Sequence, residues 1–211
     1  MSTNRTDLAP RRATRAALTR EVVLDAALTL FARRGYHGTA LSEIADALQV
    51  RTPSLYNHMD SKHELLRTIV DRTTAGVLAD FHAAVDPGDP PVEQLRRAAD
   101  VYAHRHATHR REALVVNRDT GSLEEPARSD LQARRRAHEH ALRAVIARGV
   151  EQGDFRVESP ALASFAIREL CVSIARWFSD DGELTAEAVA DQYSRFALRI
   201  VGAWDARLPP R

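Results

Sequence analysis

The stretch that decides the fold is TREVVLDAALTLFARRGYHGTALSEIADALQVRTPSLYNHMDSKHELLRTIV, residues 19–70. It opens with apolar residues at helical spacing, which predict a helix over 20–34. Thr19 can serve as its N-cap, and Gly35 supplies a C-terminal stop. The apolar stripe that we expect to face the core consists of Val22, Val23, Ala26, Ala27, Leu30 and Phe31.

Two short helices follow the first one. We predict one over 40–48, capped by Thr39, and one over 53–58, opened by the pair Thr52–Pro53, because proline suits the first helical position and threonine the cap before it. Only the three residues 49–51 separate the first of these helices from Thr52, the cap of the second. Two helices joined by so short a turn form a helix-turn-helix.

The rest of the chain also has helical periodicity, and no convincing strand pattern occurs in it. Ser61 and Glu64 have the spacing of a capping box and open the fourth helix. We therefore expect an all-α protein of about nine helices. The later ones are predicted over 62–85, up to 108 after a Pro-rich loop, over 111–120, 125–152 and 160–178, and up to 204.

The composition is that of an ordinary globular chain. Of 211 residues, 44% are hydrophobic and 28% are charged. No apolar run approaches the roughly 20 residues that a membrane span needs, and the arginine-rich start lacks the apolar core of a secretory signal. The lone Cys171 excludes an internal disulfide, so we expect a cytoplasmic protein that has no membrane partner.

Positive charge is concentrated near the start of the chain. The net charge is +1, yet residues 1–62 hold nine Arg or Lys against six Asp or Glu. A basic head on a near-neutral body is typical of a protein that touches phosphate at one end. We expect a disordered basic arm over 1–18, a helix-turn-helix domain over 19–62, and a helical effector-binding and dimerisation domain over 63–206.

The predicted third helix has the features of a recognition helix. It is too short to be stable alone and too polar to add much to a core. In a helix-turn-helix the second helix enters the major groove of DNA while the first crosses the backbone. The pattern alone leaves a second interpretation open, which is a capped connector between two longer helices.

Residues 19–70 resemble the DNA-binding domain of the TetR family of repressors. The matching features are the LFARRGY end of the first helix, Thr39, the EIA of the second helix and the block SLYNHMDSKHELL at 54–66. Two positions depart from the family pattern. Gln49 stands where members usually have glycine, which costs roughly 1 kcal/mol if that position needs positive φ. Met59 replaces a usual aromatic, which is a tolerable core exchange.

The resemblance implies DNA contacts for the matched side chains. Tyr56 and Lys62 are expected to hold backbone phosphates, and Thr39 to donate to a phosphate at the start of the second helix. Asn57 could pair with adenine and Arg51 with guanine. Further candidates for base edges or phosphates are Ser42, Thr52, Ser54 and His58. The arm residues Arg11, Arg12 and Arg15 are expected to attract phosphate, with the minor groove as an alternative.

The last two predicted helices have the features of a dimer interface. The helix over 160–178 is apolar nearly all round, so it must be buried on more than one side. In TetR-like proteins the last two helices pair with a second subunit, so we expect a homodimer through helices 8 and 9 that reads a palindrome. Ordinary core is the competing explanation for the stripe of Val189, Tyr193, Phe196, Ala197, Ile200, Val201 and Trp204.

Residues 106–204 resemble, more loosely, the effector domain of TetR-family repressors that control fatty-acid and sterol breakdown in actinobacteria. The shared pieces include HRREALVVNRD at 109–119, ARGVEQGDFR at 147–156 and DGELTAEAVADQY at 181–193. This resemblance implies an acyl-CoA thioester as the effector. A hydrophobic ligand without CoA is the alternative.

Arg168 is the first candidate for a polar ligand anchor. An arginine on so apolar a helix needs a partner, and a CoA phosphate would suit it. An internal salt bridge, for instance with Asp119, is the competing explanation. Val172 lies one turn further along and is expected on the same wall, and Asn117 is a further candidate beside an apolar run.

Other classes of function fit this sequence less well. Five histidines invite a metal site: His104, His106, His109, His138 and His140. A spacing of two residues points side chains about 200° apart on a helix. His106 and His109 could share a face, but no Cys or carboxylate cluster accompanies them. We find no Gly-rich phosphate loop and no nucleophile motif, so we expect neither an enzyme nor a cofactor. We therefore predict a DNA-binding transcriptional repressor released by a small molecule. A non-specific architectural DNA-binding protein is the alternative.

Overall fold

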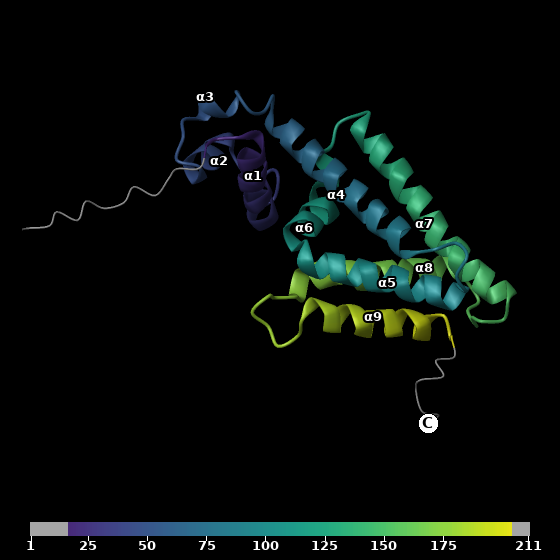
Figure 1. The fold of residues 1–211 in the computed structure, drawn as a ribbon. Coiled ribbons are helices and arrows are strands. Elements are labelled where there is room, and N and C mark those ends of the chain that lie inside the picture. The colour runs from purple at the N-terminus through teal and green to yellow at the C-terminus, as the bar shows by residue number, and fades with distance from the viewer. Residues whose placement is uncertain (1–16, 204–211) are drawn as a thin grey trace, which may run out of the picture.

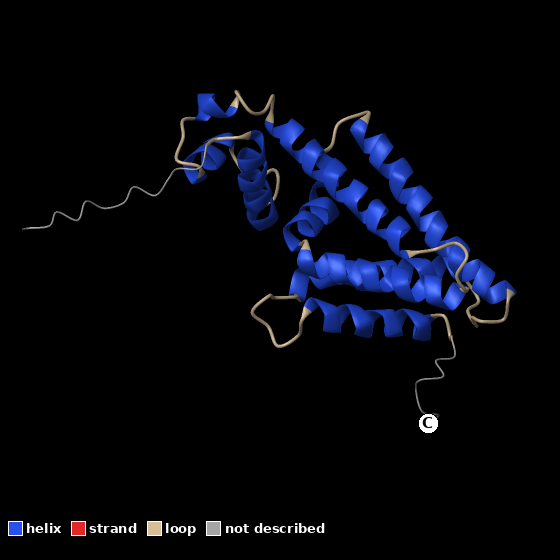
Figure 2. Ribbon diagram, in the orientation of Figure 1, coloured by secondary structure: helices blue, strands red, loops and turns tan. Residues whose placement is uncertain are grey.

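The computed structural model describes residues 17–203, and within this range every regular element is a helix (Figures 1 and 2). The predicted all-α class is confirmed. The arm arginines Arg11, Arg12 and Arg15 and the predicted interface residue Trp204 lie outside the described residues. The helices are α1 (Arg20–Arg34), α2 (Leu41–Ala47), α3 (Thr52–Leu55), α4 (Lys62–Ala84), α5 (Pro91–Thr108), α6 (Arg110–Asp119), α7 (Ala127–Glu151), α8 (Pro160–Trp177) and α9 (Ala186–Ile200), with a 3-10 turn at Thr120–Ser122.

The head, formed by α1, α2, α3 and the first half of α4, has its own hydrophobic core. α1 buries Leu24 and Leu28 but leaves Val22 and Leu30 only half-buried, so the predicted stripe is wrong by part of a turn. The reason is that both α4 and α6 pack against α1 and cover a different side of it. The cluster continues into α4 through Leu65, Leu66, Ile69 and Val70, and into α6 through Val115 and Val116.

The body is built around α5. This helix packs against α4, α6, α7, α8 and α9, with α9 and α8 as its most extensive neighbours, and Figure 1 shows α9 running alongside it. A second apolar cluster fills the body and includes Leu95, Ile146, Ile167 and Ile174. The predicted boundary between the two domains, at residues 62–63, lies at the start of α4. Because α4 contributes to both clusters, the packing is continuous across this boundary.

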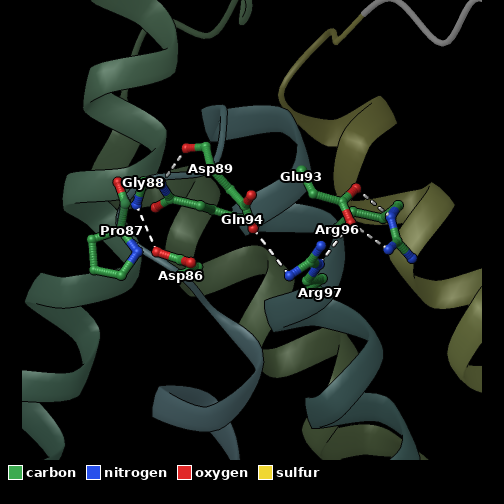
Figure 3. A network of polar contacts seen from close by, with 8 residues as sticks. All are labelled: Asp86, Pro87, Gly88, Asp89, Glu93, Gln94, Arg96 and Arg97. Carbon is green, nitrogen blue, oxygen red and sulfur yellow. Dashed lines mark hydrogen bonds and ion pairs between the residues drawn. The ribbon is translucent and has the colours of Figure 1, made fainter.

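A polar network fastens the loop over 85–90 to the start of α5 (Figure 3). The amide of Gln94 is 2% exposed, and its Nε2 donates to the carbonyl oxygens of Asp89 at 2.6 Å and Pro87 at 3.2 Å. Its Oε1 accepts from Arg148 of α7 at 2.6 Å. The loop that ends α4 is therefore tied to both α5 and α7.

No helix between residues 17 and 203 is long and apolar enough to span a bilayer. The same part of the chain holds no group of three metal-binding side chains.

Candidate DNA interface and effector pocket

α3 is held by its apolar side and presents its polar side. Leu55 is fully buried, and Met59 is 2% exposed in the place of the usual aromatic. Tyr56, between them, is 56% exposed, and Asn57 is exposed beside it. Figure 1 shows α2 and α3 at the end of the molecule away from α9. Nothing in the described chain covers this polar face.

The third helix is shorter than predicted. It ends at Leu55, and residues 56–58 form a turn in which the N–H of Met59 donates to Leu55 O at 3.1 Å. Its N-cap is Arg51 and not Thr52, so Pro53 occupies the second helical position. A non-helical turn at 56–58 splays Tyr56 and Asn57 outward from the helix end.

The predicted DNA contacts differ in exposure. Arg51 is exposed, forms no ion pair with any residue of 17–203, and is therefore free to meet an external anion. Ser42 is also exposed. The half-buried members of the set are Thr52, Ser54, His58 and Lys62, and the buried member is Thr39.

Thr39 supports the interface from inside. The prediction that it caps α2 is wrong, because the N-cap is Ala40, whose N–H donates to the carboxylate of Glu43 at 2.7 Å. Thr39 is 1% exposed and its hydroxyl donates to Gly35 O at 2.9 Å. The hydroxyl expected to reach a phosphate is thus engaged within the chain.

Lys62 crosses from the start of α4 to the start of α2. Its Nζ donates to the carbonyl oxygen of Thr39 at 2.7 Å and lies 4.3 Å from the centre of the Tyr36 ring. Partial burial lowers the pKa of Lys62 below its usual value. An ammonium has three N–H donors, so two remain for an external anion. The lysine is therefore fixed in place by contacts within the chain.

Gln49 adopts the positive φ that the missing glycine suggested, with φ of 56°. A left-handed conformation costs a residue with a Cβ about 1–2 kcal/mol, while glycine loses about 0.5–1 kcal/mol of chain entropy on folding. We expect Gln49→Gly to raise the free energy of unfolding by about 0.5 kcal/mol. Urea unfolding of the variant and the parent measures this difference, and a loss of stability would contradict it.

A cavity of about 110 Å³ lies in the body, between α4, α5, α6, α7 and α8. All three predicted ligand residues, Arg168, Val172 and Asn117, line it, so the structure brings together side chains from two helices that the sequence left unconnected. Its lining contains four arginines and no carboxylate. The other lining residues are Thr73, Thr74, Val77, Leu78, Tyr102, Arg105, His106, His109, Ala113, Val116, Arg134, Arg135, His138 and Cys171.

The proposed salt bridge between Arg168 and Asp119 does not form. Asp119 is buried and pairs with its neighbour Arg118 at 2.9 Å. Arg168 pairs with Glu169 at 2.8 Å, and its guanidinium carbon lies 5.9 Å from the centre of the Phe165 ring. The Nε of Arg168 is buried without a hydrogen-bond partner in the described chain. Arg168 thus retains a donor for a ligand.

Two lining histidines are neutral in the folded chain. Burial lowers the pKa of His106 and of His138 from 6.5 to about 4, with nearby positive charge adding to the effect. In the unfolded chain these imidazoles have a higher pKa, so as the pH falls below 6.5 the unfolded chain takes up protons before the folded chain does. The free energy of unfolding is therefore highest above pH 6.5 and decreases as the pH falls from 6.5 toward 4.

We therefore expect the melting temperature to drop between pH 6.5 and 4. The double variant His106→Gln, His138→Gln should show a shallower drop over that interval, because it lacks the two buried imidazoles. Thermal unfolding followed by circular dichroism at several pH values measures both slopes. Equal slopes would contradict the assignment.

α6 links the cavity to the head. It lines the cavity through Ala113 and Val116, and its arginines reach α1. Arg111 pairs with Asp25 at 2.9 Å, and the guanidinium of Arg118 donates to the carbonyl oxygens of Phe31 and, at 3.3 Å, of Ala32, at the end of α1. A shift of α6 would therefore act on α1 directly.

Both halves of the chain match one family. Residues 23–69 match the family model "Bacterial regulatory proteins, tetR family", and residues 88–201, more than half of the chain, match "Tetracyclin repressor-like, C-terminal domain". The chain belongs to the TetR family. It is a TetR-type DNA-binding transcriptional repressor, and TetR regulators as a class are not enzymes.

Three TetR relatives bear on the two sites. The HTH-type transcriptional repressor KstR2 of Mycolicibacterium smegmatis is 25% identical over 197 residues, which cover 90% of this chain and 94% of the relative. The structure of the ketosteroid transcriptional regulator KstR2 of Mycobacterium tuberculosis is 26% identical, with a TM-score of 0.80 over 85% of this chain and 93% of that one. AibR in complex with isovaleryl coenzyme A and operator DNA is 25% identical, with a TM-score of 0.76 over 88% and 99%.

Several lining residues of this TetR body were missed by the sequence analysis. Tyr102, Arg105 and Arg135 lie on α5 and α7, while the predicted ligand residues lie on α6 and α8. His106 and His138 were considered only as metal ligands. One signal in the sequence could have pointed to the lining residues of α7, and that is its arginine-rich run, because half-buried arginines need an anion.

Proposed function

We propose that this chain acts as a homodimer that binds a palindromic operator and is released from it by an acyl-CoA. The observation that carries the effector is the lining of the cavity, where four arginines and no carboxylate surround apolar side chains. A ligand with an apolar part and several negative charges fits such a lining, and an acyl-CoA has both. AibR, which was solved with isovaleryl coenzyme A, supports this choice.

Two of the four lining arginines lie toward the outside of the cavity. The side chains of Arg134 and Arg168 are each 40% exposed, whereas Ala113, Val116 and Cys171 are buried. We infer that the phosphates of CoA lie at this rim and that the acyl group lies among the buried side chains. The Nε of Arg168 and the exposed edge of Arg134 supply donors for phosphate oxygens.

The DNA contacts follow from the polar face of α3. We propose that Arg51 and Asn57 reach base edges and that Tyr56 and Lys62 hold phosphates, since these four side chains have free donors or acceptors on the uncovered face. Ser42, Thr52, Ser54 and His58 lie beside them. Thr39 acts indirectly, by fixing Lys62.

The dimer is proposed through α8 and α9. Leu162 and Phe165, on α8, are 70% and 44% exposed, and Trp177 at its end is 46% exposed. The half-buried Tyr193 and Phe196 continue this surface on α9, with Tyr193 6.3 Å from Trp177 between ring centres. Buried Val189, Ala197 and Val201 belong to the core of the subunit, so the predicted stripe divides between core and interface. Large exposed apolar surface of this kind marks interaction sites.

Release follows if the effector prefers a different arrangement of the helices. Only a ligand with differential affinity for two states shifts their equilibrium. The cavity is walled by α4 and α6, and α6 holds the end of α1 through Arg118. We infer that acyl-CoA shifts α6 and α4 and thereby moves the heads.

The test is a titration of purified protein on the DNA that flanks its own gene, followed by fluorescence anisotropy. We expect tight binding to that DNA over random duplex, and release by micromolar hexanoyl-CoA but not by CoA alone. Arg168→Ala should need about tenfold more ligand, since one charge-assisted hydrogen bond is lost. Arg143→Ala, with a similar arginine outside the cavity lining, is the control. Binding that ignores every acyl-CoA at millimolar concentration would refute the effector.

A further inference from the structure

Several buried polar atoms of the cavity have no hydrogen-bond partner among the described residues. Tyr102 is 4% exposed, and its hydroxyl forms no hydrogen bond within residues 17–203. Both ring nitrogens of His138 are likewise buried and unpaired, as is the Nε of Arg105. All three residues line the cavity. A buried donor without a partner is unfavourable, and such groups in native structures call for an explanation.

The packing holds two of these groups side by side. The His138 ring stands edge-on to Tyr102, with 5.1 Å between ring centres, and to Phe81, with 4.8 Å. These contacts fix the imidazole between two aromatic rings. Two polar groups from α5 and α7 are thereby presented together at the inner wall of the cavity.

The charge of this inner wall is balanced. Arg105 forms an ion pair with Asp80 of α4, so its charge is compensated. The imidazole of His138 is neutral near pH 7, because burial lowers its pKa to about 4. The hydroxyl, the neutral imidazole and the guanidinium Nε each offer a hydrogen-bond donor. The hydroxyl and the imidazole carry no charge, and the charge of the guanidinium is balanced by Asp80. Such a set suits a neutral oxygen that accepts hydrogen bonds.

We propose that the effector's acyl group carries a neutral oxygen, a ketone or hydroxyl, at the end remote from its thioester, and that Tyr102 and His138 recognise it. This inference rests on the proposed acyl-CoA effector and narrows it from any apolar acyl group to an oxygenated one. A plain alkyl chain would leave the hydroxyl and the imidazole unpaired. A carboxylate at that end would face Arg105, whose charge is already balanced by Asp80.

The experiment compares CoA thioesters that differ only in the remote oxygen. The probes are cyclohexanecarbonyl-CoA, its 4-oxo derivative and its 4-carboxy derivative, titrated into the full-length protein by calorimetry and tested for release of DNA. We expect the 4-oxo compound to bind about tenfold more tightly than the parent compound, as one or two buried hydrogen bonds provide. The 4-carboxy compound should bind no better than the parent.

Two variants assign the preference to the inner wall. Tyr102→Phe removes one oxygen atom, and His138→Phe keeps a ring between Phe81 and Tyr102 while removing both nitrogens. Each should reduce the preference for the 4-oxo compound to about threefold or less, with affinity for cyclohexanecarbonyl-CoA and for DNA unchanged. DNA binding also shows that the variants are folded.

Each other outcome has a distinct meaning. Equal affinity of the parent protein for the first two thioesters would overturn the inference and leave the acyl-CoA effector standing. A tenfold preference that survives in both variants would overturn the roles of Tyr102 and His138. Tighter binding of the 4-carboxy compound would overturn the neutral oxygen. If none of the thioesters binds while DNA does, the proposed effector itself fails and the inference falls with it.

Discussion

Lys62→Met is expected to weaken operator binding by two to four orders of magnitude. Each charge-assisted hydrogen bond to a phosphate contributes about 1.5–3 kcal/mol, and a dimer would lose two of them. The structure sharpens this expectation, because Lys62 is already held by Thr39 O and the Tyr36 ring and loses little freedom on binding. The slope of log affinity against log salt concentration should fall by about 1.8, or 0.9 for each neutralised phosphate.

Fluorescence anisotropy at four or more salt concentrations measures both effects. Arg156→Met is the matched control, since it removes one exposed positive charge in the segment between α7 and α8. Its affinity should stay within about twofold, because a charge remote from the interface is screened. The melting temperature of Lys62→Met must be recorded as well. A folded variant that keeps its affinity and its salt slope would remove Lys62 from the interface.

Phe165→Glu is expected to separate the two subunits. Phe165 is 44% exposed near the middle of the apolar surface of α8. A dimer would bury two introduced carboxylates, and the nearest guanidinium, that of Arg168, is already paired with Glu169. Burying uncompensated charge costs several kcal/mol, so the dimer dissociation constant should rise by at least about 10³-fold. DNA affinity should fall with it, because a monomer grips one half-site only.

Sedimentation equilibrium over a range of protein concentrations measures the dissociation constant. Leu184→Glu provides the control, since Leu184 is 56% exposed but lies in the segment that joins α8 to α9. It should leave the assembly unchanged. A Phe165→Glu protein that remains dimeric and binds DNA normally would show that the subunits meet elsewhere.

The helix limits could be predicted closely because the local signals are strong. Ser61 caps α4 through Glu64 N–H at 3.0 Å, and Thr185 caps α9 in the same way. Where the cap was assigned from residue type alone, as for Thr39, it was wrong, since burial turned that hydroxyl toward Gly35. The family pattern raised positive φ at Gln49 only as a condition, and the structure shows that the condition holds. Local sequence signals therefore predicted where the helices begin and end better than they predicted which side of each helix is buried.

The pocket could be predicted only in part. Arg168 and Val172 lie one turn apart, so their shared wall follows from helical geometry. The partner of Arg168 did not follow, because Asp119 is taken by Arg118 at a contact between α6 and α1 that depends on the tertiary fold. Tyr102 and His138 come into contact only when α5 packs against α7. The helical periodicity of the sequence does not show which helices pack together, so this contact could not be predicted.

The hydrogen bonds of Gln94 hold the loop that follows α4, so the C-terminal end of α4 is fixed and the helix can turn about it. Its far end is fixed through the loop to α5 and α7, while its near end begins in the head. A helix of 23 residues is about 34 Å long, so turning it by about 5° around the fixed end would swing its start by about 3 Å. In a symmetric dimer the two displacements add, so the distance between the two heads would change by about 6 Å. This change is large compared with the roughly 34 Å between successive turns of the major groove, to which the two heads must fit. With α4 anchored in this way, a small displacement at the cavity would move the two heads out of register with successive turns of the DNA.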